Sequence, residues 1–195
     1  MIAFGNCLLL MSLLQAVEGI KDIKDLIDIQ YRPLLDFKAL LDSKVPLPKA
    51  VCLLFLGVEC PVSNTMSQEF ARLHKEYGPK GVLIVGVYTE PDFSPAKAAT
   101  HAKEYSLAFP IVLDPKQTLA GQAKITLVPE AAILDAKGKL LWHGRINDLY
   151  TPEGKKRFAP TTHDLRNALN ALLLGKDLPP PAGKGYGCPL PELRN

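Results

Sequence analysis

The stretch Ala50-Val51-Cys52-Leu53-Leu54-Phe55-Leu56-Gly57 is a continuous apolar run that closes on a glycine. A run of this length and character is typical of a strand buried on both faces, as strands of a parallel sheet are. A second such run follows at Val82–Tyr88. Between the two, apolar residues recur at steps of three and four over 63–77, which predicts a helix. The order strand, helix, strand indicates a parallel sheet with a helical crossover.

The rest of the chain extends this pattern. Ser94 and Pro95 form an N-cap and first helical residue, so we expect a helix from there to about Tyr105. A short strand at 109–114 and a brief helix at 118–123 follow, and strands at 131–134 and 139–143 pair across the loop 135–138. A last helix is expected from Thr161 or Thr162, with Asp164 as acidic capping partner, to Gly175. These elements predict an α/β fold, a three-layer sandwich with a mixed β-sheet flanked by helices.

The two ends differ from this middle. Residues 7–17 have the length of a secretory h-region, although no Lys or Arg precedes them, and we expect 1–18 to be a signal peptide or an apolar leader. Residues 19–44 form an N-terminal extension to which we assign no function. The predicted domain covers 45–175. Residues 176–195 are a tail whose Pro and Gly content disfavours both helix and sheet.

Composition excludes several classes of protein. The 195 residues are 47% hydrophobic and 22% charged, which are globular values. A net charge of +3 is too small to indicate nucleic acid as a partner. No apolar run approaches the roughly 18 residues of a membrane span. Gly-rich phosphate loops, paired catalytic carboxylates and a Ser-His-Asp order are missing from the sequence, and we expect no cofactor.

Cys60 is the residue most suited to chemistry. It follows the first buried strand, where ligands gather in such sheets, and Pro61 suits the first turn of the next helix. A thiol at that point faces the positive end of the helix and its unpaired N–H groups, which favour the thiolate. Polar Ser63 and Asn64 lie close in sequence and are candidates for substrate contact. Cys52, inside the apolar strand, is expected to be inert.

The segment 55–64, Phe-Leu-Gly-Val-Glu-Cys-Pro-Val-Ser-Asn, resembles the active-site segment of the redoxin family, the branch of the thioredoxin superfamily that includes alkyl hydroperoxide reductase/thiol-specific antioxidant domains. The resemblance continues through 109–114, 128–131, 142–148 and Gly187-Cys188-Pro189, and is poor upstream of Lys49. It implies a thioredoxin-like fold. It also implies that Pro129 is cis and stands against Cys60, and that Val128 offers its backbone to a bound chain.

Two departures from the family pattern bear on the reaction. A dithiol motif would place a second cysteine at position 63, where this chain has Ser63, so Cys60 must resolve a mixed disulfide elsewhere. The peroxiredoxin pattern places Pro seven and Thr or Ser three residues before the cysteine. Leu53 and Gly57 hold those positions here, which puts efficient peroxidase activity in doubt.

Cys188 on the Pro/Gly-rich tail is a candidate resolving thiol. Its alternatives are an unpaired cysteine, or one that pairs with Cys52 or with a second molecule. Arg145 and Asp148 follow the last strand. They either form a surface ion pair or fold towards Cys60, where Arg145 would stabilise the thiolate or orient an incoming substrate. His74 and His101 are expected on exposed helix faces and His163 near a helix start. The scattered histidines predict no metal site.

Three hypotheses follow. The first is a redoxin-type thiol–disulfide oxidoreductase in which Cys60 attacks, Val128 and Pro129 hold the substrate, and Cys188 or an external thiol reductant releases it. The second is hydroperoxide reduction, an antioxidant activity, through a sulfenic acid on Cys60. The third is a binding or copper-carrying module without redox chemistry. Partners are therefore thiols, disulfides or hydroperoxides. The leader favours export to the periplasm or cell envelope, with the cytoplasm left open.

Overall fold

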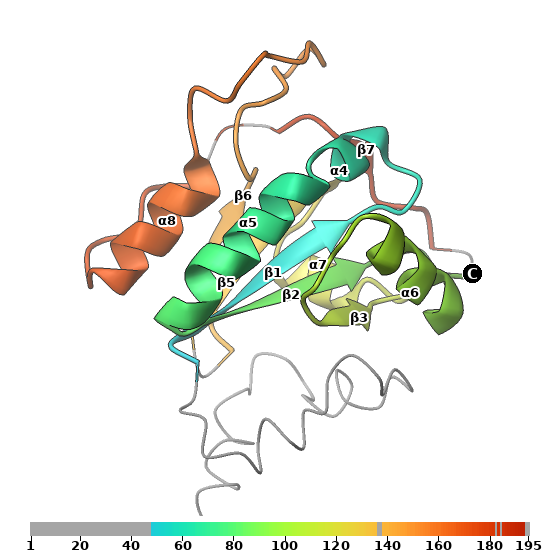
Figure 1. Cartoon of the computed structure of the whole chain (residues 1–195), viewed down its shortest axis with the longest axis horizontal. Coiled ribbons are helices and arrows are strands. Elements are labelled where there is room, and N and C mark those ends of the chain that lie inside the picture. Colours follow the sequence, from blue (N-terminus) through green and yellow to red (C-terminus); the bar gives the residue numbers. More distant parts are fainter. Residues whose placement is uncertain (1–47, 136–137, 182, 184, 194–195) are drawn as a thin grey trace, which may run out of the picture.

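A computed structural model describes residues 48–135, 138–181, 183 and 185–193, so the predicted leader and N-terminal extension lie outside the described residues. A mixed sheet forms the centre of the domain, with strand order β3-β2-β1-β5-β6 (Figure 1). Its strands are β1 (Ala50–Leu56), β2 (Val82–Tyr88), β3 (Ile111–Leu113), β5 (Glu130–Asp135) and β6 (Leu140–Gly144). β1 pairs in parallel with β2 and antiparallel with β5, which gives the mixed sheet that the sequence predicts.

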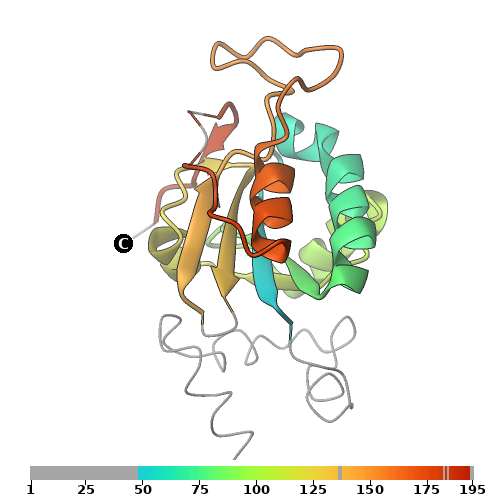
Figure 2. The ribbon, with the colours of Figure 1, turned by 90° about the vertical axis from the view of Figure 1, so that its left-hand side faces the viewer.

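Helices cover both faces of this sheet. They are α4 (Pro61–Thr65), α5 (Ser67–Tyr77), the 3₁₀ helix η1 (Gly78–Lys80), α6 (Pro95–Glu104), α7 (Thr118–Gln122) and α8 (Asp164–Leu173). Figures 1 and 2 show α5 and α8 side by side on one face, with α7 on the other. Arg166 of α8 links α8 to α5, because its Nε lies 2.6 Å from Glu69 Oε1 and its Nη1 pairs with Glu76, and both glutamates belong to α5. The architecture is the predicted thioredoxin-like sandwich.

Strand β1 lies at the centre of the core because it has a partner strand on each side and helices above and below. Every β1 residue except Val51 is buried, as the unbroken apolar run predicts. The large side chains packed around it include Phe55, Phe70, Tyr77 and Tyr88, all of them less than 2% exposed. This rigid centre fixes the carboxyl end of β1, where Cys60 follows.

The helices differ from the prediction in two places. The single helix expected over 63–77 is divided at Met66, whose N–H is shared between the carbonyls of Val62 and Ser63. The last helix begins at Asp164 rather than at Thr161 or Thr162. Those two threonines do not enter the helix because their backbone N–H groups donate to the Asp148 carboxylate instead.

The prediction that the tail forms no sheet was wrong for two residues. β7 (Cys188–Pro189) pairs antiparallel with β4 (Leu127–Val128) in a small second sheet. Proline is compatible with this position because an edge strand of two residues needs few ladder hydrogen bonds. The tail therefore returns to the domain at the point where β4 leads into β5 (Figure 2).

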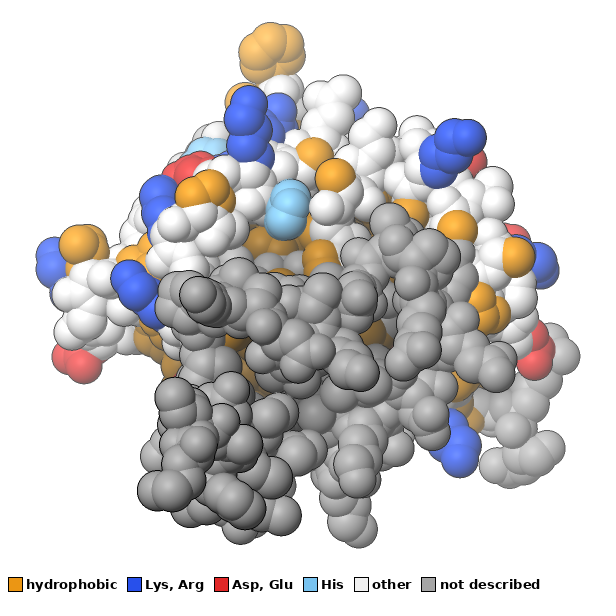
Figure 3. All heavy atoms as spheres, turned by 60° about the horizontal axis from the view of Figure 1, so that its bottom comes forward, with side chains coloured by type: hydrophobic (Ala, Val, Ile, Leu, Met, Phe, Trp, Pro, Cys, Tyr) orange, Lys and Arg blue, Asp and Glu red, His pale blue; other side chains and the backbone are white. Residues whose placement is uncertain are grey.

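Two observations describe the surface: the length and apolarity of the helices and the distribution of charge on one face. Among the residues that the structure describes, no helix combines the length and the apolarity needed to cross a bilayer. Figure 3 shows one face of the molecule, and on its coloured part the Lys and Arg side chains are scattered singly among polar and apolar ones. No feature of this face singles out a partner.

Candidate active site

Cys60 is the residue that joins β1 to the first helix. It occupies the N-cap position of α4, its N–H donates to the Gly57 carbonyl at 3.3 Å, and its own carbonyl accepts from Asn64 N–H at 3.0 Å. Pro61 takes the first helical position, as the sequence predicts. The side chain is only 4% exposed. Cys60 is thus held by a tight turn of backbone hydrogen bonds beneath other residues.

Gly57 and Ser63 explain how that turn packs. A Cβ at position 57 would lie 2.8 Å from both Cys60 Cβ and Val128 Cγ2, so only glycine leaves room there. The Gly57 N–H donates to Ser63 Oγ at 3.2 Å, and Ser63 is buried. Ser63 is therefore occupied in supporting the turn. A threonine hydroxyl at 57, as the peroxiredoxin pattern requires, would displace Cys60.

Val128, the residue before Pro129, stands against Cys60. The peptide bond between Val128 and Pro129 is cis, as predicted. The Cys60 thiol donates to the Val128 carbonyl with an Sγ–O distance of 3.4 Å. This contact joins positions 68 residues apart in sequence and closes one side of the site.

Cys188, in the tail, also lies next to Val128. It is the register partner of Val128 in the β4–β7 pair, and both Cys60 and Cys188 are free thiols. Burial, followed by the hydrogen-bonding and charge effects of Cys60, raises the pKa of Cys188 to about 12. The two thiols are therefore neighbours across Val128. Cys52 is not part of this pair: it is fully buried in β1, and burial raises its pKa to about 12.

Glu90, which the sequence did not single out, and Asn64 bind the two backbone polar groups of Val58. Its N–H donates to Glu90 Oε1 at 2.8 Å, and its carbonyl accepts from Asn64 Nδ2 at 2.9 Å. Asn64 Oδ1 lies 2.9 Å from His101 Nε2, and His101 Nδ1 lies 2.5 Å from the Tyr88 hydroxyl. Both backbone polar groups of Val58 are thereby fixed, two residues before Cys60.

These contacts correct one prediction. His101 is not on an exposed helix face: it is buried, and burial lowers its pKa. Burial also raises the pKa of the Glu90 carboxyl. The position of Glu90, just past the carboxyl end of parallel strand β2, is the signal that would have found it, since chemistry in such sheets gathers at those ends.

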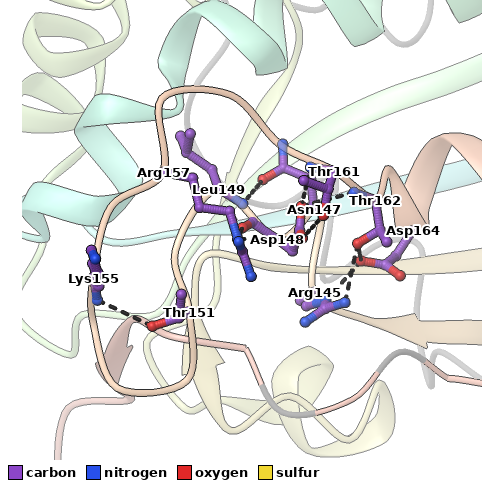
Figure 4. Close-up of polar contacts among 10 residues, drawn as sticks. All are labelled: Arg145, Asn147, Asp148, Leu149, Thr151, Lys155, Arg157, Thr161, Thr162 and Asp164. Carbon is purple, nitrogen blue, oxygen red and sulfur yellow. Dashed lines mark hydrogen bonds and ion pairs between the residues drawn. The ribbon is translucent and has the colours of Figure 1, made fainter.

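Arg145 and Asp148 do not pair with each other (Figure 4). Arg145 Nε lies 2.7 Å from Asp164 Oδ2, and its Nη2 donates to Thr162 Oγ1 at 3.2 Å. Asp148 instead accepts from Thr161 and Thr162 and pairs with Arg157 at 3.4 Å. The predicted Arg145–Asp148 ion pair is therefore wrong. Substrate contact by Arg145 stays a prediction.

No group of three or more metal-binding side chains occurs among the described residues. In the contacts that the structure describes, Cys60 and Cys188 lie next to Val128 and to backbone groups, and neither contacts a histidine or a carboxylate. The chemistry that this arrangement can support is thiol–disulfide exchange with an incoming disulfide, in which the two neighbouring thiols take part in turn.

The comparison with family models decides the family. The model of the AhpC/TSA family matches residues 34–143, which is more than half of the chain. The chain belongs to the AhpC/TSA family. The match includes β1, Cys60 and Pro129 and begins upstream of the segment that carries the resemblance described above. Cys188 lies beyond it.

Solved structures similar to this AhpC/TSA-family chain include an uncharacterized conserved protein from Geobacillus kaustophilus, with 27% identity, 73% of this chain and 76% of that chain covered, and a TM-score of 0.61. A hypothetical protein from Sinorhizobium meliloti has 24% identity, coverage of 73% and 79%, and a TM-score of 0.62. A thiol-disulfide oxidoreductase from Bacteroides fragilis has 24% identity, coverage of 52% and 76%, and a TM-score of 0.44. No curated protein matches the chain.

Proposed function

We propose that this chain is a thiol–disulfide oxidoreductase in which Cys60 attacks the substrate and Cys188 resolves the mixed disulfide. The observation that carries the proposal is the place of Cys188, which pairs with the residue whose carbonyl accepts the Cys60 thiol. Membership of the AhpC/TSA family supports a cysteine-based redox reaction. The absence of a second cysteine at position 63 explains why a resolving thiol from the tail is needed.

The reaction has two exchanges. The Cys60 thiolate attacks one sulfur of a disulfide R–S–S–R′, so that a Cys60–S–S–R bond forms and R′–S⁻ leaves and takes up a proton. The Cys188 thiolate then attacks Cys60 Sγ, which forms the Cys60–Cys188 disulfide and releases R–S⁻. One disulfide has been reduced to two thiols, and an external dithiol returns the enzyme to its reduced state.

Val128 is suited to both exchanges because its carbonyl accepts the Cys60 thiol and its backbone pairs with that of Cys188. Its carbonyl orients the Cys60 Sγ, and its pairing with Cys188 holds the second thiol at the same place. Proximity of this kind removes most of the entropy cost of a bimolecular step. Cys60 therefore needs no partner molecule for resolution.

Single-turnover reduction of oxidised glutathione, followed by intact mass, tests the proposal with three variants. Cys60→Ser is expected to abolish glutathione release, and Cys188→Ser to stop at one glutathione bound to Cys60. Cys52→Ala is the matched control and is expected to behave as wild type, since that thiol is buried away from the site. Wild-type turnover in Cys60→Ser would refute the assignment and favour a binding module.

Hydroperoxide reduction is the second candidate, because the same pair of thiols would complete it. Cys60 would take one oxygen from ROOH to become a sulfenic acid with release of ROH, and Cys188 would displace water to form the same disulfide. The family match favours it, whereas the glycine at position 57 offers no hydroxyl to the peroxide. Peroxide consumption no faster than that of free cysteine would exclude it.

A further inference from the structure

The tail strand β7 fills the edge of β4 with little room to spare. Gly187 precedes Cys188, and a Cβ at this position would collide with the Val128 carbonyl oxygen and lie 2.8 Å from its carbonyl carbon. Only glycine therefore lets the tail backbone approach the Val128–Pro129 peptide this closely. The fit is specific to this segment of the chain.

Contacts on both sides of Cys188 hold the strand in place. On one side, the ring of Tyr186 stacks on Tyr150 at a centroid distance of 5.9 Å and rests against Gly154, where a Cβ would lie 2.5 Å from it. On the other side, Gln117 Nε2 donates to the Pro191 carbonyl at 2.6 Å. The tail is thus attached at three successive points rather than at the cysteine alone.

The occupied edge is the one that an extended protein substrate would need. Protein segments commonly bind by adding a strand to a free sheet edge, where main-chain hydrogen bonds provide the affinity. A segment that carried a disulfide along β4 to Cys60 would have to take the place of Gly187, Cys188 and Pro189. Cys60 is only 4% exposed, so a substrate that leaves β7 in place can reach it only after a local movement of side chains.

We propose that β7 is a built-in occupant of the β4 edge, and that Cys60 therefore acts on low-molecular-weight disulfides in preference to disulfides held in extended protein segments. The inference rests on the proposed oxidoreductase function and names its substrate class. A small disulfide needs only a local movement of side chains over Cys60, whereas an extended segment must first undock all three attachments. Gly187 and Tyr186 are then residues that determine specificity without touching the reacting sulfur.

Two disulfide probes that share the same leaving group, thionitrobenzoate, test this inference on the full chain. The first is the mixed disulfide of glutathione with thionitrobenzoate, and the second is that of an extended ten-residue peptide with a central cysteine. Attack by Cys60 forms the Cys60 mixed disulfide and releases coloured thionitrobenzoate from either probe. The quantity measured is the ratio of the two rate constants, peptide over glutathione, in wild type, Gly187→Ala, Tyr186→Ala and Cys188→Ser.

The expected ratio is well below one in wild type and at least tenfold higher in Gly187→Ala, because the added methyl group prevents docking of β7. Tyr186→Ala is expected to raise the ratio by a smaller factor, and it tests the idea should Gly187→Ala fold poorly. Cys188→Ser keeps the strand, so the ratio is expected to stay at its wild-type value even though both rates change with the loss of the thiol beside Cys60. An equal ratio in all four proteins would overturn the inference alone. Release from neither probe in any protein would overturn the proposed oxidoreductase function and the inference with it.

Discussion

Replacement of Gly57 by alanine should displace the reactive thiol without unfolding the domain. The new Cβ would lie 2.8 Å from Cys60 Cβ and from Val128 Cγ2, whereas carbon atoms pack best at about 3.5–4.0 Å. Each of the two side chains must therefore move about 1 Å away from the new methyl group. Overpacking of this kind costs about 1–3 kcal/mol. A Gly→Ala change without strain recovers about 0.4–1 kcal/mol through the unfolded state.

The expected net loss in the free energy of unfolding is therefore about 1 kcal/mol, within a range of about 0–2.6 kcal/mol, which urea denaturation measures. The loss in reactivity should be larger. A displacement of about 1 Å at a reacting centre can reduce a rate by about a hundredfold. We expect Gly57→Ala to release thionitrobenzoate from its glutathione mixed disulfide between tenfold and a hundredfold more slowly than wild type.

Two other glycines supply matched controls. A Cβ at Gly121 meets nothing within 4 Å, so Gly121→Ala should be as stable as wild type or slightly more stable, with an unchanged rate. A Cβ at Gly86 would lie 3.0 Å from Phe109 Cε2, so Gly86→Ala should lose stability but keep its rate. A wild-type rate in Gly57→Ala, or an equal slowing in Gly86→Ala, would refute the packing argument.

Three further predictions concern charge and hydrogen bonding. Burial is the largest of the effects that raise the pKa of Cys188, and it persists when Cys60 is held in a mixed disulfide, so the resolving step followed by stopped flow should accelerate as pH rises from 7 to 9; a flat profile would contradict this. Burial opposes the charge of Asp148, but hydrogen bonds from Thr161 and Thr162 and the charge of Arg157 lower its pKa to about 2. The stabilisation of the fold by the Asp148 charge is therefore complete above about pH 4 and disappears as pH falls towards 2. Asp148→Asn should lower the free energy of unfolding by about 2 kcal/mol in urea denaturation at pH 7. An equally large loss near pH 2 would exclude the charge as its cause. Asn64→Asp keeps an acceptor for His101 but cannot donate to the Val58 carbonyl. Loss of this hydrogen bond, about 1 kcal/mol, should slow the first exchange about fivefold. Thr65→Ala is the control and should not slow it, because the Thr65 hydroxyl donates only to the Pro61 carbonyl.

The sheet and its central cysteine follow from the sequence because they depend on local patterns. The apolar run of β1 is long enough to require burial on both faces, and Cys60 follows it directly, before a proline that begins a helix. Ser94 caps α6 by accepting from the Lys97 N–H, as its place before Pro95 predicts. The cis bond at Pro129 was predicted through the family resemblance and not from the proline itself.

What the sequence did not show depends on contacts between distant residues. Nothing near Thr161 indicates that its N–H is taken by a carboxylate thirteen residues earlier, and so the start of α8 was placed too early. Alternating Pro and Gly residues conceal a strand of two residues whose partner is β4. The burial of His101 requires Tyr88 and Asn64, which come from two other elements. Each of these features is set by tertiary packing, which local propensity does not encode.

The central claim, that Cys60 and Cys188 form one redox pair, is tested most directly by a non-reducing peptide map of the wild-type protein after one equivalent of oxidised glutathione. We predict a peptide that links Cys60 to Cys188, with Cys52 recovered as a free thiol. Glutathione on Cys60 together with a free Cys188 would contradict the claim and leave a one-cysteine enzyme that depends on an outside thiol. An unmodified Cys60 would remove the enzymatic interpretation altogether.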